Sequence, residues 1–464
     1  MNDSTLISSE ERSLQRYILL VTTFTSFLVS FLGSAGNLAL PTIGREFNAS
    51  AVLLGWITTG YILASSTFML PFGRLADIVG RKKIYSSGLL LYTISTCVII
   101  FSWNIASLIF LRVVQGFAGA MLFGTSMALL SAVYKTGERG KAIGINITST
   151  YLGLSIGPVL GGLLTQYFGW RSIFIILVPF LIVSLAFMKL KIKTEWADAK
   201  GEKFDWKGSV VYTIALFGFM FGFSRLPANT GWICLASGLL LGTAFVFLEL
   251  KTDNPIFDFK LILTNRVFAF SSIAALINYS ATAAIGFFMS LYLQYLKGFD
   301  ARAAGLIMIS QPAAMALLSP VAGRLSDKMN PGIIASIGMG IITVDLVLLH
   351  FINENTQVIH LVILLVTMGA GFGLFSTPNS NAIMSSVQKN QLGTASGVIG
   401  TMRSIGQMMS MSIAMMLLAI YTGTEQISPE TYGGLIKAIR TGFLTLAVLS
   451  VIGILASLAR NKRN

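Results

Sequence analysis

The chain has 464 residues, of which 54% are hydrophobic and only 11% charged, and its mean hydropathy is +0.75. This balance excludes a water-soluble globular fold. Although 33 Lys and Arg against 19 Asp and Glu give a net charge of +14, the basic residues fall mainly in short segments between apolar runs. That pattern is typical of membrane topology and argues against a nucleic-acid partner.

Apolar runs of the length that crosses a bilayer, about 20 residues, follow one another along the chain. Gly, Pro and charged residues divide them into fourteen predicted spanning helices. Six come first, at 17–40, 51–72, 84–102, 106–133, 142–165 and 170–190. Two more follow at 207–223 and 231–250, and the last six at 267–292, 303–322, 333–352, 358–380, 392–420 and 438–460. We therefore expect an all-α polytopic membrane protein with a six-helix bundle at 1–190, a two-helix linker region at 191–266 and a second six-helix bundle at 267–464.

The Lys and Arg of the predicted loops fall mostly on the side that holds both chain ends, which predicts cytoplasmic termini. A polar N-terminus without a small-residue cleavage site predicts that the first helix is an uncleaved anchor. The sequence thus favours a multi-pass protein of the cell membrane. Its two cysteines lie inside apolar runs, and its two histidines flank a short polar loop. We expect no disulfide, metal site, cofactor or catalytic histidine cluster.

A repeated segment supports the two-bundle organisation. Gly73-Arg74-Leu75-Ala76-Asp77, which continues through Gly80 and Arg81, recurs as Gly323-Arg324-Leu325-Ser326-Asp327. Both copies follow the second helix of a six-helix block, in predicted cytoplasmic loops. Small residues there would permit a tight turn, and the Asp could face a helix N-terminus or an Arg. The two blocks are therefore interpreted as parallel copies.

Two further helices carry distinctive patterns. In the fourth, Arg112 lies on the same face as Gly116 and Gly119, so it packs against other helices or lines a cavity, unless backbone carbonyls hold it in a structural role. In the fifth, Gly153, Gly157 and Gly161 repeat every four residues, followed by Gly162, and Pro158 favours a bend. Ordinary tight packing is the alternative for this glycine face.

These patterns resemble a known family. The repeated segment is similar to motif A of the major facilitator superfamily, the Arg112 segment to motif B, and the glycine segment to motif C, which is associated with exporters and antiporters. Other segments resemble its fourteen-helix drug/proton antiporter branch, among them 37–41, 56–61, 170–171, 205–208, 291–294 and 369–378. The resemblance implies the major facilitator fold and multidrug efflux by proton antiport. One departure is Leu32, where the branch usually has an Asp.

Without that Asp, the first six helices have no acid at mid-membrane depth. Asp345, in the eleventh helix, is the only deep acid in the sequence and is a candidate proton carrier or partner of Arg403, with a structural role as the alternative. Arg112 is the second coupling candidate. The residues favoured to line the substrate path are Asn37, Tyr61, Arg112, Asn278, Gln311, Arg403 and Gln407.

The leading hypothesis is a monomeric secondary exporter of hydrophobic or amphiphilic small molecules, driven by a proton gradient. No P-loop motif is present, which argues against ATP coupling. The second hypothesis keeps the fold but makes the cargo an anionic metabolite or lipid, because Arg112 and Arg403 lack a first-helix acid. An integral membrane enzyme is the third, and the lack of a nucleophile constellation argues against it.

Overall fold

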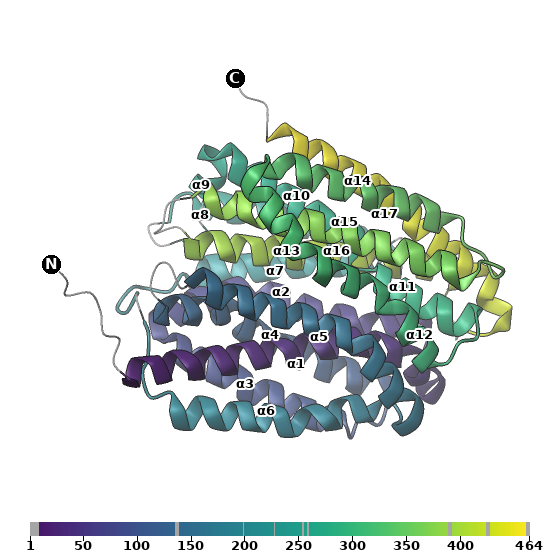
Figure 1. The fold of residues 1–464 in the computed structure, drawn as a ribbon, viewed down its shortest axis with the longest axis horizontal. Helices are drawn as coiled ribbons and strands as arrows, with labels where there is room; N and C mark the ends of the chain where they lie inside the picture. The colour runs from purple at the N-terminus through teal and green to yellow at the C-terminus, as the bar shows by residue number, and fades with distance from the viewer. Residues whose placement is uncertain are drawn as a thin grey trace.

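The computed structural model describes residues 9–134, 139–197, 199–226, 228–252, 255–257, 259–387, 392–423 and 427–460. These residues form an all-helical bundle (Figure 1). The first part comprises α1 (Ser9–Phe47), α2 (Ala51–Val79), α3 (Arg81–Ile99), α4 (Ile105–Val133), α5 (Arg139–Phe168) and α6 (Arg171–Lys191). α7 (Trp206–Ser224), α8 (Asn229–Glu249) and the short α9 (Phe259–Thr264) follow. The remainder comprises α10 (Arg266–Thr282), α11 (Ile285–Leu291), the π-helix η1 (Tyr292–Leu296), α12 (Ala301–Met308), α13 (Ser310–Lys328), α14 (Pro331–His350), α15 (Val358–Ser385), α16 (Leu392–Thr422), η3 (Pro429–Thr431) and α17 (Tyr432–Ala459).

The helices form two groups, called here the first half (α1–α6) and the second half (α10–α17). Within the first half, α1 packs along α5 and α2 along α4, and within the second half α13 and α14 pack along α15. α7 and α8 pair with each other, and α7 also contacts α2 of the first half and α16 of the second. Only 17% of the most apolar window of α8 is buried, so this helix lies at the periphery.

The structure corrects several predicted helix ends. α1 continues through Pro41 to Phe47, and α2 extends to Val79, so the Gly73–Asp77 segment forms the last turns of a helix and not a loop. The turn itself is made by Gly80, whose φ of 128° is a conformation that favours glycine. The matching segment Gly323–Asp327 likewise lies within α13.

Two predicted single helices are interrupted. The ninth predicted helix is divided into α10, α11 and the π-helix η1, and the tenth into α12 and α13. Interruptions of this kind are often found at functional sites of helices. The sequence does not reveal them, because apolar periodicity continues through both breaks.

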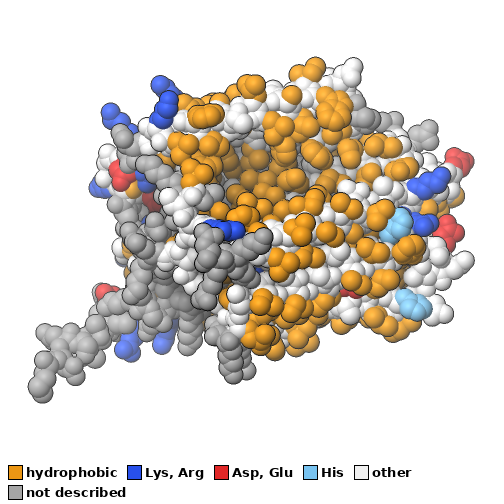
Figure 2. Space-filling model, turned by 90° about the horizontal axis from the view of Figure 1, so that it is seen from above, with side chains coloured by type: hydrophobic (Ala, Val, Ile, Leu, Met, Phe, Trp, Pro, Cys, Tyr) orange, Lys and Arg blue, Asp and Glu red, His pale blue; other side chains and the backbone are white. Residues whose placement is uncertain are grey.

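In the described residues, twelve helical segments are long and apolar enough to cross a membrane. The predicted third and fifth spans, α3 and α5, are not among them. α3 begins with three basic residues and α5 is rich in Gly, Ser and Thr, which lowers the mean hydropathy of both. Hydrophobic side chains cover the middle of the molecule in Figure 2, whereas most charged side chains lie toward its two ends, as the apolar core of a bilayer requires.

Candidate functional site

The two halves are joined by polar contacts at the end of the bundle where α1 meets α11 and η1 and where α5 meets α12, which we call the sealed end. The hydroxyl of Ser290 donates to the carbonyl oxygen of Asn37 at 2.5 Å, and the Gln294 amide donates to that of Leu38 at 3.3 Å. The Tyr295 hydroxyl donates to the carbonyl oxygen of Pro41 at 3.4 Å.

The local sequence of α1 explains why a side chain of the other half can bind there. In a helix the N–H of residue 41 would donate to the carbonyl of residue 37, but Pro41 has no N–H. The Asn37 carbonyl is therefore free of its usual helix partner, and Ser290 of the second half supplies the missing hydrogen bond. Since Ser290 is fully buried, this contact is shielded from water.

Glycines bring the halves together at a second point of the sealed end. A Cβ added to Gly162 of α5 would overlap the carbonyl oxygen of Ala301, and one added to Gly305 of α12 would overlap that of Pro158. Nearby, Arg302 donates to the Tyr167 hydroxyl at 3.1 Å. The backbones of α5 and α12 can approach this closely only because both positions lack a side chain.

The remaining glycines of the α5 pattern face the first half itself. An added Cβ at Gly153 would lie 2.5 Å from the carbonyl oxygen of Phe27, and one at Gly161 would lie 2.5 Å from the Cβ of Ala35. Gly157 is equally close to α1, at Phe31 and Ser34. The glycine face predicted from the sequence thus packs against α1, while Gly162 and Pro158 meet α12.

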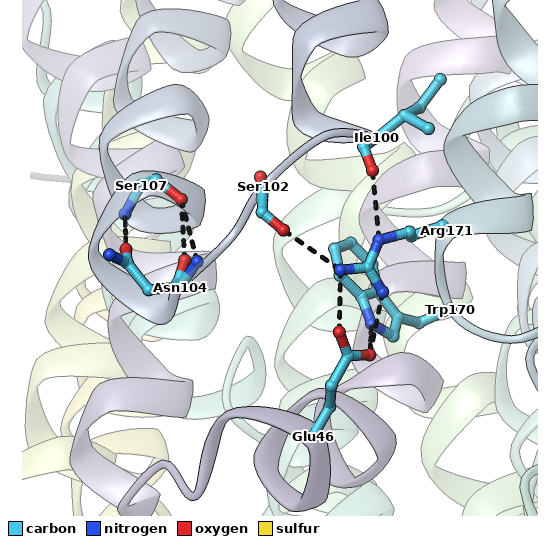
Figure 3. Close-up of polar contacts among 7 residues, drawn as sticks. All are labelled: Glu46, Ile100, Ser102, Asn104, Ser107, Trp170 and Arg171. Atoms are coloured by element: carbon cyan, nitrogen blue, oxygen red, sulfur yellow. Dashed lines mark hydrogen bonds and ion pairs between the residues drawn. The ribbon is translucent and has the colours of Figure 1, made fainter.

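Ionic contacts fasten the first half at the same end (Figure 3). Glu46, at the end of α1, forms an ion pair of 2.7 Å with Arg171 and accepts a hydrogen bond of 2.7 Å from the Trp170 indole. Arg171 also donates to the carbonyl oxygens of Ile100 and Ser102, both at 3.1 Å. The start of α6 is therefore tied to α1 and to the α3–α4 connection, which makes the first half a coherent unit.

At the opposite end, the Asp77 carboxylate accepts from the Arg81 Nε at 2.8 Å, so of its two predicted partners it has the arginine. Glu195 of the α6–α7 connection accepts from the backbone N–H groups of Lys82 and Lys83 at 2.8 and 3.1 Å, and thereby caps α3. Gly323 lies against Thr377 of α15. The side chain of Asp327 lies outside what the structure describes.

Arg112 is buried, with 6% of its surface exposed. Its Nε donates to the carbonyl oxygen of Ile57 at 3.2 Å, its Nη1 donates to Gln115, and its guanidinium lies 4.5 Å from the centre of the Tyr61 ring. Gly119 leaves the space that the Tyr61 hydroxyl occupies. A carbonyl, an amide and an aromatic face thus surround this arginine, as the structural alternative anticipated, and within the described residues it forms no ion pair with a carboxylate.

Arg403 of α16 lies between the halves. It interacts electrostatically with Tyr61 of α2 and with Tyr151 of α5, both in the first half. The Tyr151 hydroxyl is also 3.1 Å from that of Ser376 in α15, which bridges the halves directly. Gln407, one helical turn after Arg403, is half-buried, and so is Gln311 of α13, whose carbonyl closely faces Gly369.

Asn278 and Asn37 contain buried polar atoms that have no hydrogen-bond partner in the described structure. Asn278 is fully buried in α10, and neither of its amide atoms is paired; the same holds for the Asn37 side-chain oxygen. Just beyond Asn278 the helix breaks, and the backbone N–H of Ala284 donates to the Ser410 hydroxyl at 2.9 Å. Unpaired buried amides are costly and are satisfied in native proteins by water or a ligand.

Asp345 lies away from these groups. Its Oδ1 accepts from Thr367 of α15 at 2.9 Å, its Oδ2 is buried without a partner, and the residue is 4% exposed. Thr367 is exposed on the outer surface of the bundle. Among the described residues no ion pair joins Asp345 to Arg403, so the suggested pairing of the two is not formed here.

The contacts of Ser290, Gln294, Gly305 and Glu195 were not anticipated from the sequence. One signal for the first of them is present: a proline inside a helix frees the carbonyl four residues before it. The partner could not be named, because it lies 253 residues away. The buried Arg460 was also missed; it donates to Ser271 and Asn379, both at 2.9 Å.

Comparison with known proteins gives consistent results. The family model described as the Major Facilitator Superfamily matches residues 22–411 and 273–463. The chain is 30% identical over 393 residues to the riboflavin transporter RibZ of Clostridioides difficile (strain 630), covering 84% of this chain and 86% of that protein. It is 29% identical over 415 residues to the multidrug resistance protein Stp of Mycobacterium tuberculosis (strain ATCC 25618 / H37Rv), covering 88% and 76%.

Solved structures share the fold. A bacterial homolog of the human lysosomal transporter Spinster, in an inward-facing and unoccupied conformation, has a TM-score of 0.66 and 16% identity, with 98% of this chain and 99% of that one covered. The human organic anion transporter MFSD10 has a TM-score of 0.63 and 13% identity, with 96% and 99% covered.

Proposed function

Because the chain belongs to the major facilitator superfamily, a family of transporters and not of enzymes, we propose that it exports hydrophobic or amphiphilic small molecules by alternating access, in exchange for protons. All fourteen predicted spans cross the membrane in this proposal, including α3 and α5. The protein acts as a monomer in the cell membrane, with both termini in the cytoplasm.

The observation that carries this proposal is the double use of the glycine segment of α5. Gly153, Gly157 and Gly161 pack against α1, whereas Gly162 meets α12 of the other half. A segment that both stiffens one half and seals it against the other is what alternating access requires of a helix. With cytoplasmic termini the sealed end is extracellular, so this arrangement loads its cargo from the cytoplasm.

The similarity to a protein named a multidrug resistance protein supports drug efflux, and the similarity to one named a riboflavin transporter supports a planar, polar aromatic cargo. Both types of compound are amphiphilic. An anionic metabolite or lipid is the second candidate, and one observation favours it: Arg112 and Arg403 are the charged groups near the centre, and the deep acid Asp345 faces away from them.

A transport assay in proteoliposomes tests the proposal. A panel of fluorescent amphiphiles is offered on the outside while the lumen is made more acidic than the bath. Molecules with their cytoplasmic face outward should then accumulate dye and release protons from the lumen. Protein-free vesicles and the Gly305→Val variant, whose added side chain would overlap the Pro158 carbonyl, serve as controls. Equal accumulation with and without the gradient refutes proton coupling, and accumulation of no compound in the panel refutes export.

A further inference from the structure

Arg403 is a charged side chain at membrane depth without a protein partner. It is half-buried in the middle part of α16, and it forms no hydrogen bond or ion pair within the part of the chain that the structure describes. A guanidinium has five N–H donors in a fixed plane and stays charged. Since an isolated charge at this depth is expensive, its position calls for a compensating group.

The residues facing Arg403 provide no negative charge. Tyr61 of α2 and Tyr151 of α5 lie within electrostatic range of it, and Tyr279 of α10 lies within range of Tyr151. The next charged group is the cation of Arg112, stacked on the Tyr61 ring. The region between the halves is therefore positive and aromatic.

The Tyr61 hydroxyl supplies the second, independent observation. Its oxygen is buried and has no hydrogen-bond partner among the described residues. A hydroxyl can donate to an acceptor that the nearby guanidinium also binds. Two unsatisfied donor groups from opposite halves, α2 and α16, thus lie next to the same region.

We propose that Arg403 and the Tyr61 hydroxyl form a binding site for the anionic group of an aromatic amphiphile, such as a carboxylate. The planar guanidinium matches the two oxygens of a carboxylate, and the tyrosine rings offer faces on which an aromatic ring can stack. This inference rests on the proposed export function and names its substrate class. Because the two donors belong to different halves, the bound anion also contacts both halves at once.

Two dyes with the same xanthene ring and opposite charge test the proposal: fluorescein, an anion, and the ethyl ester of tetramethylrhodamine, a cation. Their equilibrium binding to the purified full-length protein is measured by fluorescence polarisation, for the parent and for Arg403→Gln and Arg403→Lys. Arg225→Gln changes an arginine in the exposed α7–α8 connection and is the matched control. Titration with inorganic phosphate distinguishes a site for the dye from a site for a free anion.

Loss of a charge-assisted hydrogen bond predicts that Arg403→Gln weakens fluorescein binding about 10- to 100-fold. Arg403→Lys should recover part of this loss, and the rhodamine ester should bind every variant within about two-fold of the parent. Equal losses for both dyes, an unchanged fluorescein affinity, or a parent protein that prefers the cation would overturn the proposal. Displacement of fluorescein by millimolar phosphate would assign the site to a free anion instead.

Dye accumulation by the parent separates the two levels of inference. If neither dye is transported under any gradient, the export function fails. If both dyes are transported at equal rates and Arg403→Gln slows both alike, export stands and the anion site is refuted.

Discussion

Replacing Ser290 with Ala removes the hydrogen bond that closes the sealed end onto Asn37. In the closed arrangement the Asn37 carbonyl would then have neither a helix partner, because of Pro41, nor a partner from the other half. A buried acceptor left unpaired costs about 1–3 kcal/mol. When the halves separate at this end, water reaches the carbonyl and the cost disappears.

The expected result is a shift of the closed–open equilibrium toward the open state by about 5- to 150-fold, which is the same free energy expressed as a ratio. Spin labels at Trp103 in the first half and Phe351 in the second would report it. Both side chains are largely exposed, at 75% and 63%. Pulsed electron–electron spin resonance gives the two distance populations in a background from which Cys97 and Cys234 have been removed.

A matched control is Ser319→Ala, because the Ser319 hydroxyl bonds a carbonyl of its own helix, that of Met315 at 2.7 Å. That substitution should leave the populations unchanged. The decisive comparison uses Pro41→Ala, which restores an N–H for the Asn37 carbonyl. In that background Ser290→Ala should cost much less, giving a coupling free energy of about 1 kcal/mol or more in the double-mutant cycle.

Two outcomes would refute this reasoning. The distance distribution of Ser290→Ala could equal that of the parent, which would mean that the hydrogen bond carries no net energy. Alternatively, Ser290→Ala could shift the equilibrium equally in the parent and in the Pro41→Ala background, in which case the free carbonyl is not the origin of the effect.

Further predictions follow from the same contacts. Gly305→Ala should also favour opening of the sealed end, because overpacking against Pro158 costs about 1–3 kcal/mol, whereas Gly242→Ala, which has open space, should leave the spin-label distances unchanged. Asp345→Asn should weaken substrate-dependent proton movement more than substrate binding; parallel flux and binding measurements that match the parent would remove Asp345 as coupling group. A cysteine at Asn229 should react with an impermeant reagent added to intact cells and one at Lys200 should not, and the reverse labelling would contradict cytoplasmic termini.

Features that depend on neighbouring residues in the chain were predictable. Apolar runs indicate the positions of the helices, and the four-residue spacing of Gly153, Gly157 and Gly161 predicts a close-packing face, which the structure places against α1. Helix ends were less accurate. A proline and two small residues suggest that helices stop near residues 40 and 72, yet α1 and α2 continue beyond them, because packing and a lipid surround override such local signals.

Features that depend on distant residues were not predictable from one sequence. Asp345 stands out in the sequence as the only deep acid, but its neighbour Thr367 comes from a helix whose rotation periodicity does not fix. The same holds for the pairing of Pro41 with Ser290. Proline shows that a carbonyl is free, while only the three-dimensional arrangement shows which donor takes it.

The contacts of α1 and α5 explain why the sealed end should open in one step. The glycine face holds α5 against α1, and the Glu46–Arg171 ion pair ties α6 to the end of α1, so these helices move together. α1 carries the Asn37 carbonyl and α5 carries Gly162, each of which meets the second half. A rigid unit cannot release one of these contacts while it keeps the other, because close-packed helices repack between discrete arrangements and do not deform continuously. Motif C therefore contributes to transport in two ways: most of its glycines make the first half rigid, and its last glycine uses that rigidity at the junction.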